Sequence, residues 1–227
     1  MIQAARPGEN EDPKPVFKFK AAIAVLLPLT LLGCAGDGEI TATGITVTRS
    51  ACPAVAIPAA TGDVTLFSPE NARTADAIDV VAHITNLRTT CDESGDNIVA
   101  TVSFDIRAQR RDSRGAREVV VPYFGTVVQG GTSVISKSIS NAGLRFADGE
   151  LRASTTGQAT ASVSRAAATL PEDIRKQITR ERKPGDADAA IDPLSDPAVR
   201  EAVRRASFEL LVGFQLTQEQ LAYNATR

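Results

Sequence analysis

Two segments of the chain alternate apolar and polar residues with a period of two, which is the pattern of a strand with one buried face. Successive side chains of a strand point to opposite faces of its sheet, so we expect the apolar set of each segment to face a common core. The sets are Ile98, Ala100, Val102, Phe104, Ile106 and Ala108 in residues 98–109, and Phe208, Leu210, Val212, Phe214 and Leu216 in residues 208–217.

Shorter segments rich in β-branched residues predict further strands. They are residues 40–48, 64–67, 78–85, 119–128, 133–140 and 151–164. The charged turn 110–115 joins 98–109 to 119–128 and predicts a hairpin between them, while Pro122 predicts an edge position or a bulge. Gly130 and Gly131 predict the next turn.

The pattern changes between about residues 165 and 207. The segment Thr169-Leu-Pro-Glu172 matches a capping box and predicts a surface helix to about Arg182. A second helix of about ten residues is expected from Asp196-Pro197. Its inward positions are Val199 and Val203. We therefore expect a mainly β fold: an antiparallel sandwich with a helical insertion at about 165–207 before the last strand, with a closed barrel as the alternative.

Composition narrows the function classes. The chain has 227 residues, a formal net charge of −2 and 43% hydrophobic residues, as a globular domain does. This balance argues against nucleic-acid binding, which needs a clustered basic face. With no Trp, one His and three Cys, we expect neither a metal site nor a cofactor.

The N-terminal segment has the pattern of a secretory signal peptide. Lys14, Lys18 and Lys20 precede the uncharged, mostly apolar run Ala21–Gly33. As a helix this run would measure about 20 Å, short of a hydrocarbon core of about 30 Å, so a membrane-spanning helix is the weaker alternative. The leader before it is long and partly acidic, which leaves the translation start open between Met1 and Val16.

The end of this run resembles the lipobox of bacterial lipoproteins in Leu31-Leu32-Gly33-Cys34. The resemblance implies cleavage before Cys34, acylation of Cys34 and attachment to a membrane facing the periplasm. Ala35, in place of the Asp that retains many Gram-negative relatives at the inner membrane, implies the outer membrane. The expected organisation is a signal peptide at 1–33, a lipidated tether at 34–39 and a sandwich domain at 40–227.

The lipobox also bears on the other two cysteines. If Cys34 is lipidated, Cys52 and Cys91 remain as an even pair in an oxidising compartment. We expect a disulfide between them, with two buried free thiols as the alternative.

Candidate chemistry elsewhere is sparse. His83 lies within a predicted strand, and no Gly-x-Ser-x-Gly motif accompanies it, so a surface histidine is favoured over a catalytic one. Acidic residues 186–196 fit a linker with helix caps better than a calcium loop. The arginines of residues 107–117 are consistent with either an anion site or a solvated turn. Gly130-Gly131 leads into a strand, which excludes a phosphate loop.

We therefore expect a non-enzymatic envelope lipoprotein whose domain resembles immunoglobulin-like periplasmic modules that bind partners through strand edges or loops. Its expected partners are the membrane, through the anchor, and an envelope protein. A periplasmic hydrolase or a lipid-ligand carrier is the alternative.

Overall fold

The computed structural model describes residues 38–41, 44–47, 50–180, 182–183, 185–188 and 190–226. The signal segment 1–33 and residues 34–37 of the tether lie outside these residues. No helix within the described part of the chain is both long and apolar enough to cross a membrane.

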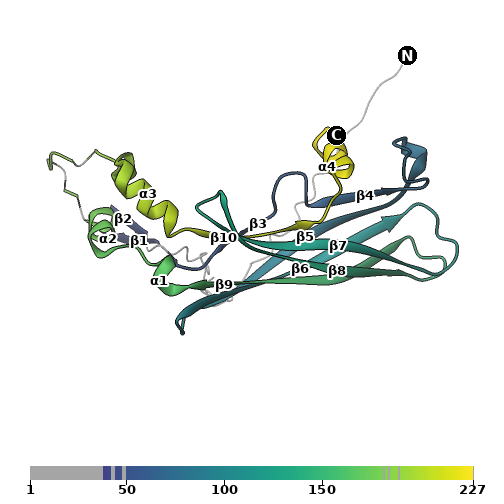
Figure 1. Ribbon diagram of the computed structural model, residues 1–227, viewed down its shortest axis with the longest axis horizontal. Helices are drawn as coiled ribbons and strands as arrows, with labels where there is room; N and C mark the ends of the chain where they lie inside the picture. The colour runs from purple at the N-terminus through teal and green to yellow at the C-terminus, as the bar shows by residue number, and fades with distance from the viewer. Residues whose placement is uncertain are drawn as a thin grey trace, which may run out of the picture. The chain divides into compact units, whose positions relative to one another are not determined.

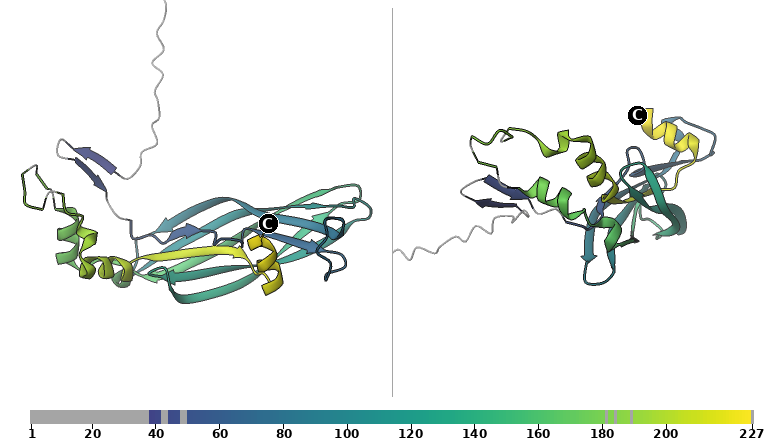
Figure 2. Two further views of the ribbon diagram at one scale, coloured as in Figure 1. Left: turned by 90° about the horizontal axis from the view of Figure 1, so that it is seen from above. Right: turned by 60° about the vertical axis from the view of Figure 1, so that its left-hand side comes forward.

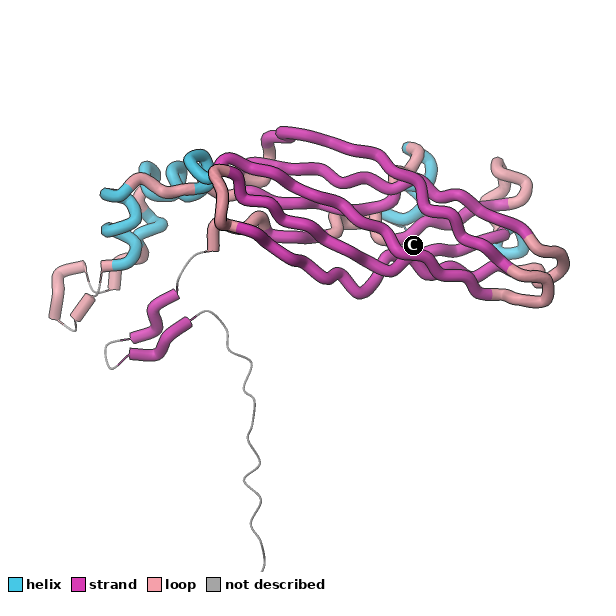
Figure 3. Tube along the Cα trace, turned by 90° about the horizontal axis from the view of Figure 1, so that it is seen from below, coloured by secondary structure: helices cyan, strands magenta, loops and turns pink. Residues whose placement is uncertain are grey.

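Two four-stranded sheets pack face to face as a sandwich (Figures 1 and 3), which confirms the expected fold class. Sheet I has the order β4 (Asp63–Phe67), β5 (Ile78–Asp92), β6 (Asn97–Arg110) and β9 (Arg152–Ser164). Sheet II has the order β3 (Ala54–Ala56), β10 (Phe208–Phe214), β7 (Arg117–Gln129) and β8 (Ser133–Phe146). Neighbouring strands are antiparallel except β3 and β10, which are parallel, so sheet II is mixed.

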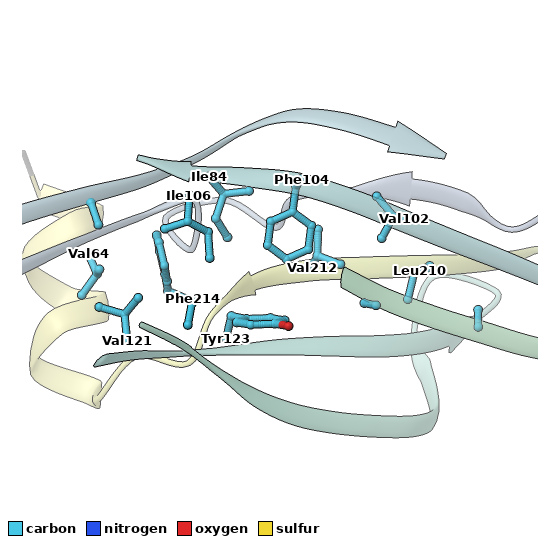
Figure 4. Close-up of a cluster of buried hydrophobic side chains, with 14 of the residues drawn as sticks. Val64, Ile84, Val102, Phe104, Ile106, Val121, Tyr123, Leu210, Val212 and Phe214 are labelled. Atoms are coloured by element: carbon cyan, nitrogen blue, oxygen red, sulfur yellow. The ribbon is translucent and has the colours of Figure 1, made fainter. Parts of the chain in front are cut away.

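The core lies between the sheets and contains the apolar residues that the alternation predicts to be buried. All six apolar positions of β6 are buried, and so are Phe208, Leu210, Val212 and Phe214 of β10. The rings of Phe104 and Tyr123 meet edge to face across the two sheets with centroids 5.3 Å apart (Figure 4). Gly157 lies opposite Phe104 in the β6–β9 pair, and a Cβ there would come 2.3 Å from Phe104 Cε2. The aromatic contact therefore needs glycine on β9.

The hairpin predicted between residues 98–109 and 119–128 is wrong. β6 pairs with β5 and β9 in sheet I, whereas β7 pairs with β10 and β8 in sheet II. The charged turn therefore crosses from one sheet to the other. The β8–β9 connection crosses back beside it, and Gly149 N donates to Ser113 O across the two connections at 2.8 Å.

Arg110 holds these two crossings together. Its side chain is buried, with the residue 1% exposed, and it donates four hydrogen bonds of 2.6–2.8 Å to backbone carbonyls. Two acceptors, Ser113 O and Gly115 O, belong to the first crossing, and two, Ala147 O and Glu150 O, belong to the second. Its guanidinium also lies 5.2 Å from the centre of the Phe146 ring. Among the described carboxylates, none forms an ion pair with Arg110, so carbonyl dipoles satisfy this charge.

Pro122 does not lie on an edge strand, contrary to expectation, because β7 runs between β10 and β8. β10 ends at Phe214, which pairs with Tyr123, and Gln215 N donates to Pro122 O at 2.9 Å. The N and O of one strand residue point to the same side. Pro122 therefore lacks its N–H on the side that faces β10, and β10 ends at this level.

Two other strands differ in length from their predictions. Where one strand was predicted over 40–48, the described residues form two antiparallel strands, β1 (Gly38–Thr41) and β2 (Gly44–Val47). β5 continues past Asn86, where the strand was expected to close, to Asp92. Asn86 takes a φ of 57°, and the pairing with β6 shifts between Thr85 and Arg88, so the strand passes through a β-bulge where it was expected to end.

The helical excursion before the last strand is confirmed (Figure 2) and contains α1 (Arg165–Ala168), α2 (Glu172–Thr179), the short 3₁₀ helix η2 (Pro193–Ser195) and α3 (Pro197–Arg205). α2 buries no residue, as predicted, but the capping box is wrong, because the Thr169 hydroxyl donates to Arg165 O instead. In α3, Val199 and Ala202 are buried, whereas Val203 is half-buried.

Two helical elements lie outside the helical insertion that the sequence predicts. The short η1 (Ala75–Ala77) precedes β5, and α4 (Gln218–Thr226) follows β10. α4 is fixed at the β4 side by the Asn224 amide, which donates to Ala60 O and Asp63 O, and by Tyr223, whose ring meets Phe67 at 5.2 Å.

Replacing Arg110 by lysine should lower the free energy of unfolding by about 2–4 kcal/mol, because one ammonium group cannot reach four carbonyls arranged around a planar guanidinium. Urea denaturation of the full chain measures this loss. The control is Arg114→Lys: Arg114 is exposed and pairs with Asp112 at the surface, so we expect no resolvable change in the free energy of unfolding. Equal losses in the two variants would contradict the role given to Arg110.

Candidate interaction surface

The predicted disulfide is confirmed, and the predicted lipidation site lies outside the described residues. Cys52 and Cys91 are joined, with Cα atoms 6.3 Å apart, so the chain before β3 is tied to the end of β5. The lipobox residues Leu31, Leu32, Gly33 and Cys34 cannot be placed in the same way, because none of them is described.

The disulfide lies beside a carboxylate. Cys52 Sγ is 2.7 Å from Glu93 Oε1, and Cys52, Cys91 and Glu93 are the described residues whose potential metal-ligating atoms converge. Both sulfurs are consumed by the disulfide, so neither is a thiolate, the form in which cysteine ligates a metal. In the oxidised protein this cluster is a covalent cross-link.

His83 is exposed on the outer face of sheet I. In the strand register it lies between Asp63 on β4 and Arg107 on β6. A hydrolase of the serine type needs a nucleophile on one side of the histidine and a carboxylate on the other. An arginine occupies the side where that nucleophile would be needed, so this row of side chains does not form such a triad.

The arginines of residues 107–117 do not form one free basic patch. Arg110 is buried, and Arg111 donates to Asp76 O. Arg117 pairs with Asp79, and this ion pair raises the pKa of Arg117. Arg114 binds Asp112 and holds the pKa of that carboxyl well below its usual range. These internal partners favour the turn over an anion site, with Arg110 buried rather than solvated as expected.

The acidic segment 186–196 caps helices and pairs with arginines. Asp192 accepts from Leu194 N and Asp196 accepts from Ala198 N, as expected of helix caps. Asp188 accepts two hydrogen bonds from Arg180, of 2.5 and 2.6 Å, at the wall of a cleft of about 350 Å³. The segment therefore stabilises the helical excursion.

The N-terminal part of β8 is exposed on both faces. Every residue from Ser133 to Asn141 is exposed, whereas Ala142, Leu144 and Phe146 further along the same strand are buried. β8 is also the last strand of sheet II, so one side of its backbone has no neighbour among the described strands. Three sides of this segment therefore face solvent. We call residues 133–141 the β8 overhang.

The overhang arises because sheet I stops beneath β7. The Tyr123 hydroxyl donates to Gln158 O at 3.2 Å, and a Cβ on Gly125 would lie 2.7 Å from Ala159 Cβ. β9, the edge strand of sheet I, thus packs against β7. Ser136 and Ser140 pair with the buried Val127 and Tyr123, so they point to the core side, yet both are exposed.

The outer face of the overhang carries apolar side chains around one lysine. Val134, Ile135 and Ile139 are 62%, 53% and 59% exposed. Ile135 is the bulged residue, since Val134 pairs with Val128 and Ser136 pairs with Val127. The Lys137 ammonium lies 5.2 Å from the centre of the Phe124 ring on β7. No described carboxylate forms an ion pair with Lys137.

The other sheet edges are shorter or better covered. β3 has three residues, and β4 has five with an irregular pairing between Leu66 and Phe67. β9 buries every second residue from Gly157 to Val163. Short edges resist the addition of another strand, whereas a long open edge permits it.

The sequence identified this segment as a strand but not as an overhang. The sequence does indicate weak burial of this strand. Serines alternate with Ile135, Lys137 and Ile139, so neither face carries a full set of large apolar residues. Such a strand can lie only at the margin of a core.

Comparison of the chain with known protein families, curated proteins and solved structures finds no match.

Removing the disulfide in a Cys52→Ser, Cys91→Ser double variant should lower the free energy of unfolding by about 4 kcal/mol, because the bond closes a loop of 39 residues. Urea denaturation measures the loss, and alkylation followed by mass spectrometry reports the thiols. In the native protein Cys52 and Cys91 should react only after reduction. Alkylation of both without reductant would show that the bond does not form.

Proposed function

We propose that this chain is a bacterial envelope lipoprotein, lipidated at Cys34, held at the periplasmic face of the outer membrane, and acting as a non-enzymatic interaction module. The observation that carries the anchor is Leu31-Leu32-Gly33-Cys34 at the end of an apolar run preceded by lysines. Two or three acyl chains on one cysteine give stable attachment, whereas a single chain would be marginal.

The Cys52–Cys91 disulfide supports the proposed location in the periplasm. Disulfides persist in the periplasm and are rare in the reducing cytosol. Pairing these two cysteines leaves Cys34 as the odd one, and acylation gives it a role that a free thiol in an oxidising compartment would lack.

The interaction role is supported by what the surface offers. The strand register surrounds His83 with Asp63 and Arg107, and the arginines and acidic residues described above are engaged with one another or with the backbone. The β8 overhang, in contrast, exposes backbone and apolar side chains together. Immunoglobulin-like periplasmic modules, which this domain is proposed to resemble, bind partners through such edges.

In cells fed a palmitate analogue, the native chain should incorporate the label and fractionate with membranes, while Cys34→Ala should do neither and keep its leader. The Cys52→Ser, Cys91→Ser variant is the matched control and should be labelled as strongly as the native chain, since it retains the acylated thiol. Undiminished labelling of Cys34→Ala would contradict the lipoprotein proposal.

A further inference from the structure

The unpaired side of β8 is long enough to bind another strand. Residues 134–140 are slightly longer than a typical strand, which has about five to six residues. An edge strand presents a row of N–H and C=O groups that water alone satisfies, and an extended peptide can bond to them. Since both faces of the overhang are open, sheet I would not block an added strand from either side.

We propose that the β8 overhang binds an extended segment of another envelope protein as an added strand, with a carboxylate opposite Lys137 and an aliphatic side chain opposite Ile139. This inference rests on the proposed role as an interaction module and names the chemistry of its partner.

The side chains of the overhang specify that chemistry. Lys137 and Ile139 pair with Thr126 and Phe124 of β7, so they share the outer face of sheet II. Directly opposite pairs of aliphatic residues and of opposite charges stabilise neighbouring strands, whereas like charges destabilise them. The ammonium of Lys137 has an aromatic ring beneath it and no ion-pair partner among the described carboxylates, so it is available to an incoming carboxylate.

A second copy of the chain fits this edge poorly. Ile135-Ser136-Lys137-Ser138-Ile139 is the same in both directions, so an antiparallel pair of copies that matches isoleucine with isoleucine places Lys137 opposite Lys137. A lysine within an edge strand and a bulge beside it are both devices that oppose pairing between identical edges. The same lysine favours a partner strand that carries the opposite charge.

Two synthetic peptides test the proposal with the full chain in detergent. One is Thr-Ile-Thr-Glu-Thr-Ile-Thr, and the other has lysine in place of glutamate. Fluorescence anisotropy of the labelled peptides should show the glutamate peptide binding about threefold to tenfold more tightly to the native chain. Lys137→Glu should reverse this preference. Lys183→Glu, which makes the same charge change at an exposed residue of the helical excursion, should leave it unchanged.

Amide hydrogen exchange locates the bound peptide. Protection on adding the glutamate peptide should be confined to 134–140 and its pairing partners on β7. The proposal is overturned by absence of binding, by equal binding of both peptides, by an unreversed preference in Lys137→Glu, or by protection elsewhere. It is also overturned if sedimentation shows a dimer that dissociates in the Lys137→Glu variant.

The peptide result and the anchoring result are separable. Cys34→Ala should bind the glutamate peptide as the native chain does, because the overhang is distant in sequence from the acylated residue and needs no lipid. Peptide binding without palmitate labelling would contradict only the proposed anchor. Labelling without peptide binding would contradict only the proposed partner site.

Discussion

The arrangement of both sheets depends on how one buried guanidinium is satisfied. Arg110 ends β6 and donates to four carbonyls divided between the β6–β7 and β8–β9 connections, the two places near this end where the chain passes from one sheet to the other. A buried charge without hydrogen bonds would cost several kcal/mol, so the two connections must hold their carbonyls around it. This requirement ties the start of β7 and the start of β9 to the end of β6, at the point where the chain changes sheets.

The β8 overhang follows from that path and from the close approach of β9 to β7. Gly125 and Gly157 lack the side chains that would keep the strands apart, and Phe104 and Tyr123 fill the space between the sheets. Because β9 packs beneath β7, the first half of β8 pairs with β7 on one side only, with no described strand on its other side and no part of sheet I covering it. The same packing that completes the core thus leaves one edge open, and an open edge with mixed apolar and charged side chains is suited to binding a strand.

Strand periodicity predicted the core of this protein but not its topology. The six apolar positions of β6 and four of β10 are buried as the period of two indicates, because alternation directly reports which face is covered. The β6–β7 hairpin was wrong because a charged turn looks the same whether the chain reverses within one sheet or crosses to another. Arg110 is the next position after Ala108 in the core-facing set of β6, but it was grouped with exposed arginines because a charge at the end of a strand usually faces solvent. The carbonyls of residues 113–150 that enclose its guanidinium come together only in the folded chain. The disulfide followed from counting cysteines, whereas the overhang depends on where sheet I ends, which is a tertiary property.

The proposed role requires that this chain meet its partner through β8 in the envelope. Photo-crosslinking in living cells tests it directly, with a photoreactive residue placed at Ile139 or, as the control, at the exposed Ser162 on β9. We expect one discrete adduct from position 139, found in the membrane fraction and identified by mass spectrometry as another envelope protein carrying the cross-link in an extended acidic segment. Position 162 should yield no such adduct. Equal adducts from both positions, or an adduct of two copies of this chain, would contradict the account.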